Sequence, residues 1–154
     1  MTEVWFYELE RSTVEQVLPE LLERTLARGW RALVRTGDPA RLTVLDQHLW
    51  AYRDDSFLPH GRADEPRAAQ QPVLLVAEAG AAPDGAAPNG ADVLFLLDGA
   101  EPGDLSGYQR CVLIFDRNNA GELNAARGRW PAFRRQGLSV SYWRQGDRGW
   151  EKMQ

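Results

Sequence analysis

Two short apolar runs, VLFLLD at residues 93–98 and CVLIFD at residues 111–116, decide the fold class of this chain. Neither run alternates apolar with polar residues, which is the pattern of strands buried on both faces of a parallel sheet. A third run of the same kind, VLLVAE, covers residues 73–78. Such strands need helices on both sides, so the sequence predicts a three-layer α/β/α domain around a mainly parallel sheet of about five or more strands.

Outward from these runs, strand and helix patterns alternate. Segments rich in aromatic and β-branched residues predict three more strands: VWFYEL (4–9), WRALVRT (30–36) and LSVSYWR (138–144). Between the first two, valines and leucines at helical spacing predict a helix that ends near Gly29. Ser12 and Thr13 offer its N-cap, with Glu15 three residues after Ser12 as a capping box.

Two more helices are expected. The first starts at Asp38-Pro39 and places Leu42, Leu45 and Leu49 on one face. The second covers about residues 119–136, where Pro131 predicts a kink or a break because proline lacks the helical N–H. The Ala/Gly/Pro-rich residues 79–91 predict a surface loop, and we expect one domain over residues 1–154.

Length and composition are those of one soluble globular domain, with 154 residues, 44% apolar and 26% charged. The single cysteine, Cys111, lies inside an apolar run, so core packing is its expected role. No apolar run reaches the roughly 18 residues that span a bilayer, and the N-terminus lacks a signal-peptide pattern. We therefore expect a cytoplasmic protein with no membrane segment.

Charge is distributed unevenly along the chain. The net charge is -4, but residues 1–116 hold 10 Lys and Arg against 19 Asp and Glu, whereas residues 117–154 hold 8 against 3. A net negative charge argues against a strong direct grip on nucleic-acid phosphates. The distribution predicts an acidic body with a basic C-terminal face that suits an anionic partner.

The usual catalytic motifs are missing from the sequence. The turn after the first predicted strand, ELERSTVE, contains no glycine, and there is no GxxxxGK[ST] motif to hold nucleotide phosphates. There is no GxSxG motif either, and Cys111 lies within a strand rather than at a helix N-terminus that would lower its pKa. We therefore expect no catalytic residues and no cofactor.

One alternative to that expectation lies in LWAYRDDSFLPHG, residues 49–61. Asp54, Asp55 and His60 could form the site of a small nucleotide- or metal-dependent hydrolase. An ordinary turn stabilised by the two carboxylates is the simpler interpretation. Asp46 and His48 lie about 200° apart around a helix, so they cannot bind one metal together there.

The aromatic residues of the same stretch leave a second choice open. Trp50 and Phe57 flank a polar turn, where a loop lies on the surface. They either pack under the loop as a small additional core or form a docking surface for another protein.

The predicted helix near the C-terminus carries the other candidate site. Within and just before AARGRWPAFRRQG (125–137), one apolar stripe has arginines beside it: Leu123, Ala126, Trp130, Phe133 and Gly137, with Arg127, Arg134 and Arg135. A solvated amphipathic helix explains this pattern, and so does an aromatic-floored pocket rimmed by guanidinium groups. Such a pocket would suit an acidic peptide that ends in an apolar residue and a free carboxylate. Direct stacking of single-stranded DNA is a further hypothesis, which the net charge disfavours.

These residues together resemble the chi subunit of bacterial DNA polymerase III holoenzyme. The resemblance runs from Val4 to Lys152 and rests on three stretches besides the N-terminal FY: LDQHLWAYRDDSFLPHG (45–61), RGRWPAFRRQG (127–137) and YWRQGDRGWEK (142–152). Residues 79–91 would be a variable loop of this single chi-like domain.

The resemblance implies a non-catalytic accessory subunit of the clamp-loader complex in DNA replication. Chi proteins bind the acidic C-terminal tail of single-stranded DNA-binding protein, so their contact with nucleic acid is mostly indirect. They also bind the psi subunit, which links chi to the clamp loader. In some bacteria, chi pairs through an overlapping surface with an iron–sulfur helicase that acts in DNA repair.

The resemblance also implies which residues form each surface. The tail site falls on the C-terminal helix, with Arg127 and Trp130 as the principal matches and three further positions in support: Phe133, Arg134 and Arg135. Pro131 and Leu123 stand where family members carry basic residues, which implies either weaker binding of the tail or compensation by Arg135. The psi or helicase interface falls within residues 49–61, on Trp50, Phe57, Leu58, Pro59 and His60.

Overall fold

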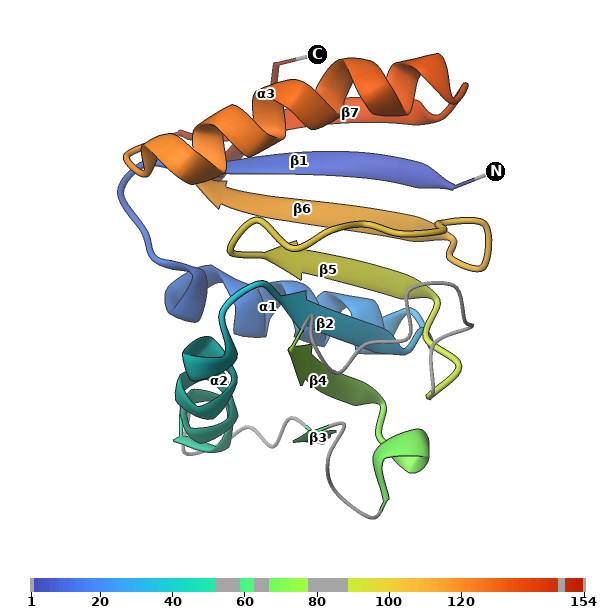
Figure 1. The fold of residues 1–154 in the computed structure, drawn as a ribbon. Helices are drawn as coiled ribbons and strands as arrows, with labels where there is room; N and C mark the ends of the chain where they lie inside the picture. Colours follow the sequence, from blue (N-terminus) through green and yellow to red (C-terminus); the bar gives the residue numbers. More distant parts are fainter. Residues whose placement is uncertain (1, 52–58, 63–66, 78–88, 147–148, 154) are drawn as a thin grey trace.

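One eight-stranded sheet with helices on both faces makes up the described structure (Figure 1). This computed structural model describes the chain except residues 1, 52–58, 63–66, 78–88, 147–148 and 154. The strands are β1 (Glu3–Leu9), β2 (Ala32–Thr36), β3 (His60–Arg62), β4 (Val73–Ala77), β5 (Val93–Leu97), β6 (Arg110–Asp116), β7 (Ser139–Gly146) and β8 (Gly149–Lys152). The helices are α1 (Val14–Ala27), α2 (Pro39–Ala51), α3 (Ala120–Arg135) and the short 3-10 helix η1 (Ala68–Gln70).

The strand order is β3-β4-β2-β5-β6-β1-β7-β8. Neighbouring strands are parallel throughout, except that β7 and β8 are antiparallel. The prediction of a mainly parallel sheet in a three-layer α/β/α domain is confirmed, with β3 and β8 as strands that were not predicted. Strand β1 lies between β6 and β7, the two strands that α3 connects.

The two faces of the sheet have separate cores because successive side chains of a strand point to opposite faces. In β1, Val4 and Phe6 join the core under α3, whereas Tyr7 and Leu9 join the core under α1 and α2. The expectation of helices on both faces is therefore confirmed.

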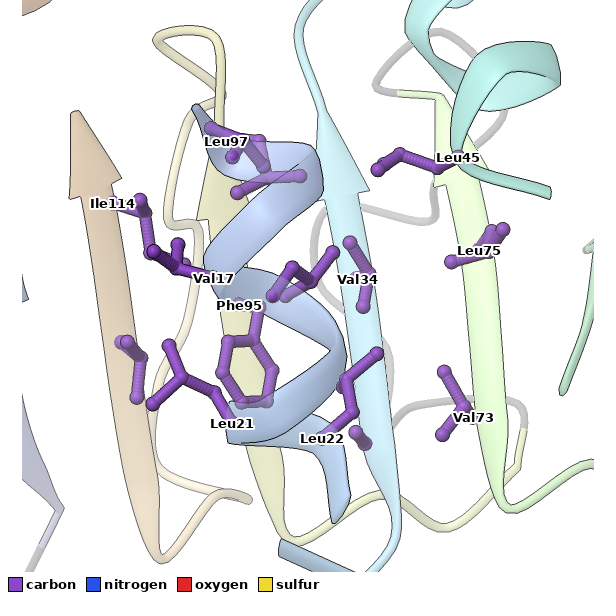
Figure 2. Packing of buried hydrophobic residues seen from close by; sticks show 14 of the residues in the cluster. Val17, Leu21, Leu22, Val34, Leu45, Val73, Leu75, Phe95, Leu97 and Ile114 are labelled. Carbon is purple, nitrogen blue, oxygen red and sulfur yellow. The ribbon is translucent and has the colours of Figure 1, made fainter. Parts of the chain in front are cut away.

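The core under α1 and α2 is built from apolar residues at helical spacing. Figure 2 shows Val17, Leu21 and Leu22 of α1 packed over Val34 and Phe95 of the sheet. The predicted face of α2 is buried as well, with relative exposures of 6% or less: Leu42, Leu45 and Leu49. Helices α1 and α2 therefore cover one face of the sheet, and α3 covers the opposite face.

Helix α1 has one of the two predicted N-cap residues, but its capping box lies one residue later than predicted. Thr13 is the N-cap, with extended backbone (φ -94, ψ 165), and its N–H donates to Gln16 Oε1 at 2.9 Å. Ser12 and Glu15, the predicted capping box, make other contacts. Ser12 Oγ accepts a hydrogen bond from Gln145 Nε2 at 2.7 Å, and Glu15 forms an ion pair with Arg41 of α2.

A kink or a break was predicted at Pro131; α3 is continuous through this residue, so the break does not occur. Asn119 caps the helix by accepting a hydrogen bond from the Glu122 N–H at 3.1 Å. Trp130 and Phe133, on either side of the proline, both contact the ring of Phe6, with centroid distances of 5.3 and 6.0 Å. This packing holds the helix in place despite the missing backbone donor.

Cys111 has the expected core position in β6, where its relative exposure is 0%. Burial raises the pKa of its thiol to about 12. The thiol is therefore protonated at neutral pH and is not poised as a nucleophile.

Candidate functional site

A pocket of about 320 Å³ opens between α3 and the carboxyl ends of β6, β1 and β7. Its floor is apolar and largely aromatic: Phe6, Phe115, Leu123, Ala126, Trp130 and Tyr142. Three arginines and one carboxylate complete the lining: Arg117, Arg127, Arg144 and Glu8. The pocket therefore combines a place for an apolar group with an excess of positive charge.

The aromatic floor is assembled from three elements around Phe6. The Tyr142 ring on β7 is stacked with Phe6 at 6.4 Å and an interplanar angle of 11°, and Trp130 meets both rings edge-on. Phe115 of β6 contacts Tyr142 edge-on at 6.2 Å. Phe6 and Phe115 are almost fully buried, and the partly buried Trp130 and Tyr142 pack against them.

The polar contacts of the pocket centre on Glu8, which is only 3% exposed. Its carboxylate accepts a hydrogen bond from Tyr142 Oη at 2.5 Å and one from Arg144 Nε at 2.7 Å. Arg117 Nη1 lies 4.0 Å from the same carboxylate. A buried charge needs such partners, because water does not solvate it there.

These contacts change the proton affinities of the groups around Glu8. Burial, followed by the hydrogen bond and the negative charge of Glu8, raises the pKa of the Tyr142 phenol. The hydrogen bond with Glu8, followed by its charge, also raises the pKa of Arg144. Tyr142 therefore stays neutral and Arg144 stays positive across the physiological pH range.

The structure brings two of the predicted tail-site residues into this pocket. Arg127 is exposed at its rim, and Trp130 lies in its floor. Phe133 is 2% exposed and packs behind the floor against Phe6. Arg134 and Arg135 are exposed in the last turn of α3 and do not line the pocket.

The remaining polar residues of the pocket were not predicted from the sequence. Arg117 directly follows the strand CVLIFD, and its N–H donates to the Leu9 carbonyl at 2.8 Å. Glu8 and Arg144 lie side by side on β1 and β7. Binding residues gather where the carboxyl ends of parallel strands meet, but the sequence does not reveal which strands are neighbours.

A second hollow, of about 370 Å³, lies on the opposite face between α1 and strands β5, β6 and β1. Arg110 lies 3.7 Å from the Trp5 ring centroid and pairs with Glu3 at 3.2 Å, while Arg28 lies 4.0 Å over Trp30. These arginines already have ring or carboxylate partners, whereas Arg127 beside α3 has none among the described residues, so we place the candidate site at α3.

The second predicted surface is described only at its two ends. Trp50 lies in the last turn of α2, Pro59 is half-buried, and Phe57 and Leu58 fall outside the described residues. Its assignment as an interface therefore stays a prediction.

His60 belongs to β3 rather than to a loop, and its side chain is 0% exposed. Its Nε2 lies 3.0 Å from Asp46 Oδ1 and 3.2 Å from the Asp46 carbonyl. Such a buried ring holds β3 against α2 and offers no side-chain surface to a partner. The assignment of His60 to the psi or helicase interface stays a prediction.

The hydrolase alternative finds little support in the described part of the chain. Asp54 and Asp55 lie outside it, and the Nε2 atom of His60 is directed at Asp46. No group of three or more His, Cys, Asp or Glu among the described residues could hold a metal ion. Within the same residues, no helix is long and apolar enough to cross a membrane.

Comparison with known proteins identifies the family. The sequence model of the family described as "DNA polymerase III chi subunit, HolC" matches residues 1–141. DNA polymerase III subunit chi of Pseudomonas aeruginosa is 31% identical over 144 residues, which cover 91% of this chain and 94% of that protein. The probable DNA polymerase III subunit chi of Rickettsia prowazekii is 22% identical over 117 residues, covering 76% of this chain and 67% of that protein.

A similar fold also occurs in a much larger protein. The crystal structure of the Pyrococcus furiosus Hef helicase domain matches with a TM-score of 0.53 and 14% identity, over 77% of this chain and 27% of that one. At this identity, the likeness concerns the fold alone.

The fold and the pocket define a three-layer α/β/α domain with a cleft suited to an anionic ligand that carries an apolar group. The chain belongs to the DNA polymerase III chi subunit family. This membership assigns it to DNA replication, as an accessory subunit of the polymerase.

Proposed function

We propose that this subunit is non-catalytic and that it binds the acidic C-terminal tail of single-stranded DNA-binding protein in the pocket beside α3. It bridges that protein to the psi subunit of the clamp-loader assembly, in the cytoplasm. The observation that carries the proposal is the meeting of Arg127 and Trp130 in one arginine-rimmed, aromatic-floored pocket. The tail's terminal apolar side chain would enter the floor, and its carboxylates would pair with the rim.

The charge of the rim supports an acidic ligand. Arg127 makes no ion pair or hydrogen bond with any described residue, and its side chain is exposed. Arg129, in contrast, is turned away toward the Gly99 carbonyl at 3.0 Å and Glu101 at 3.5 Å. A guanidinium without an internal partner is available for a bidentate contact with a carboxylate.

The direct test is calorimetric titration of the chain with an acidic peptide that ends in Pro-Phe. Arg127→Ala should weaken binding about tenfold, the effect of losing roughly 1.4 kcal/mol from one charged contact. Trp130→Ala should also weaken it, and added salt should reduce the affinity of the unmodified chain. Arg24→Ala is the matched control, because it removes one exposed positive charge from α1 on the opposite face of the sheet.

Peptide binding that is undetectable at low salt, or that survives both pocket substitutions, would show that the tail assignment is wrong. Thermal unfolding of each variant separates a lost contact from a lost fold.

The psi contact is proposed for the segment from Trp50 to His60, on the strength of the family resemblance. An affinity pull-down from cell extract, with bound proteins identified by mass spectrometry, tests it. Phe57→Ala should lose psi, or an iron–sulfur helicase that uses the same surface, and retain single-stranded DNA-binding protein. Arg127→Ala should show the opposite pattern, and loss of the same partner from both variants would contradict two separate surfaces.

A further inference from the structure

We propose that the anion-binding half of the pocket is formed mainly by the strand-end arginines Arg117 and Arg144, and that the buried carboxylate of Glu8 limits their charge. Glu8 thereby acts as a specificity-determining residue, since a ligand must bring more than one carboxylate to bind well. This inference rests on the proposed function, because it assigns the residues that receive the acidic ligand.

The position of these residues is fixed by the sheet. Glu8 of β1 is in register with Phe115 of β6 on one side and with Arg144 of β7 on the other. Register partners in parallel strands point to the same face, which here is the face covered by α3. Arg117 follows β6 and is anchored by its backbone bond to Leu9.

The hydrogen bonds leave donors free at the opening of the pocket. Arg144 uses Nε for Glu8, and within the described residues its two Nη nitrogens make no hydrogen bond. Arg117 contacts Glu8 at 4.0 Å and has a side chain that is 47% exposed. Both guanidinium groups therefore have N–H groups available to a ligand carboxylate.

Glu8 already occupies part of the site that such a ligand would use. Its carboxylate accepts hydrogen bonds from the phenol of Tyr142 and the guanidinium of Arg144. These are the donors that a carboxylate of the ligand would use. The lining holds three arginines against this one acid. A weakly charged ligand gains little from a pocket that is partly neutralised, whereas a run of acidic residues can engage all three arginines at once.

The helix alone does not supply this charge. Arg134 and Arg135 lie outside the pocket, and α3 contributes Arg127 as the one arginine of its lining. The other two arginines come from the strand ends, so removing them should reduce affinity at least as much as removing Arg127.

The experiment titrates the acidic Pro-Phe peptide into the full chain and into Arg117→Ala, Arg144→Ala, Glu8→Gln and the control Arg24→Ala. The two arginine variants should bind about tenfold more weakly. Glu8→Gln keeps the size of the side chain and removes its charge, so it should bind several-fold more tightly, most clearly for a peptide with fewer acidic residues.

The outcomes separate this inference from the proposed function. If the unmodified chain does not bind the peptide, both fail. If Arg127→Ala weakens binding while Arg117→Ala and Arg144→Ala match the Arg24→Ala control, the proposed function stands and the inference is wrong. Unchanged or weaker binding by a folded Glu8→Gln chain also overturns the role of Glu8. If Glu8→Gln does not fold, the two arginine variants decide the matter.

Discussion

The hydrogen bond between Tyr142 and Glu8 links the pocket to the stability of the fold. Burial, followed by the hydrogen bond and charge of Glu8, raises the pKa of Tyr142 above its ordinary value of 10.0. The folded chain therefore holds the phenolic proton more tightly than the unfolded chain does. This contribution to stability is complete below about pH 10 and is lost as the pH rises above that value.

We therefore expect the free energy of unfolding, measured by urea titration, to fall as the pH rises above about 10. Tyr142→Phe has no proton to lose at this position, so its stability should fall less over the same range. At neutral pH the variant should be less stable by about 1 kcal/mol, the net value of one hydrogen bond. Equal pH dependence in the two chains would contradict the assigned contact.

At the scale of elements, α3 contains a proline that its own packing has to accommodate. Pro131 is exposed, lies inside the helix and lacks the N–H that would bond to the Arg127 carbonyl. Pro131→Ala should raise the free energy of unfolding by about 1–3 kcal/mol, because it restores that hydrogen bond without removing a buried contact. Urea unfolding measures this change, and a loss of stability would show that the proline ring itself supports the helix.

The loops that follow β2 and β5 approach each other closely at the carboxyl ends of these neighbouring strands. A Cβ atom added at Gly37 would lie 2.5 Å from the carbonyl oxygen of Asp98, in backbone that has little freedom to move. Gly37→Ala should therefore lower the free energy of unfolding by about 1–3 kcal/mol. Gly107→Ala is the matched control, because a Cβ there meets nothing within 4 Å. Equal melting temperatures for the two variants would contradict the close approach.

The elements were predictable to the extent that their patterns are local. Continuous apolar runs predicted β4, β5 and β6, and helical spacing predicted the stripe on α3 that carries Trp130 and Phe133. The three residues of β3 and the four of β8 are too short to give such a pattern. The capping box shifted by one residue because Ser12 and Glu15 found long-range partners that spacing cannot indicate.

The candidate site was predictable only in part, for a related reason. The stripe on α3 pointed to Arg127 and Trp130, but it could not separate Arg127 from Arg134 and Arg135. Which arginines line a pocket depends on where the neighbouring strands end. Glu8 and Arg144 are 136 positions apart and become neighbours only because β1 lies between β6 and β7.

At the scale of the whole molecule, the charge distribution of the sequence becomes a spatial separation. The basic residues 117–154 form α3, β7 and β8 at one end of the sheet, and β3, β4 and α2 lie at the other end (Figure 1). An acidic tail bound beside α3 and a protein bound near β3 would therefore occupy different ends of the subunit. This arrangement would suit the proposed bridging role, because two partners bound at these ends would not compete for space.

The acidic tail is proposed to bind beside α3 at the carboxyl ends of β6, β1 and β7. Heteronuclear NMR titration of the labelled chain with the acidic Pro-Phe peptide tests it most directly. Shifts should concentrate on the Trp130 indole N–H, on the side chains of Arg127 and Arg144, and on the backbone around Arg117. Shifts that gather instead around Trp5 and Trp30 on the opposite face, or near β3, would contradict the account.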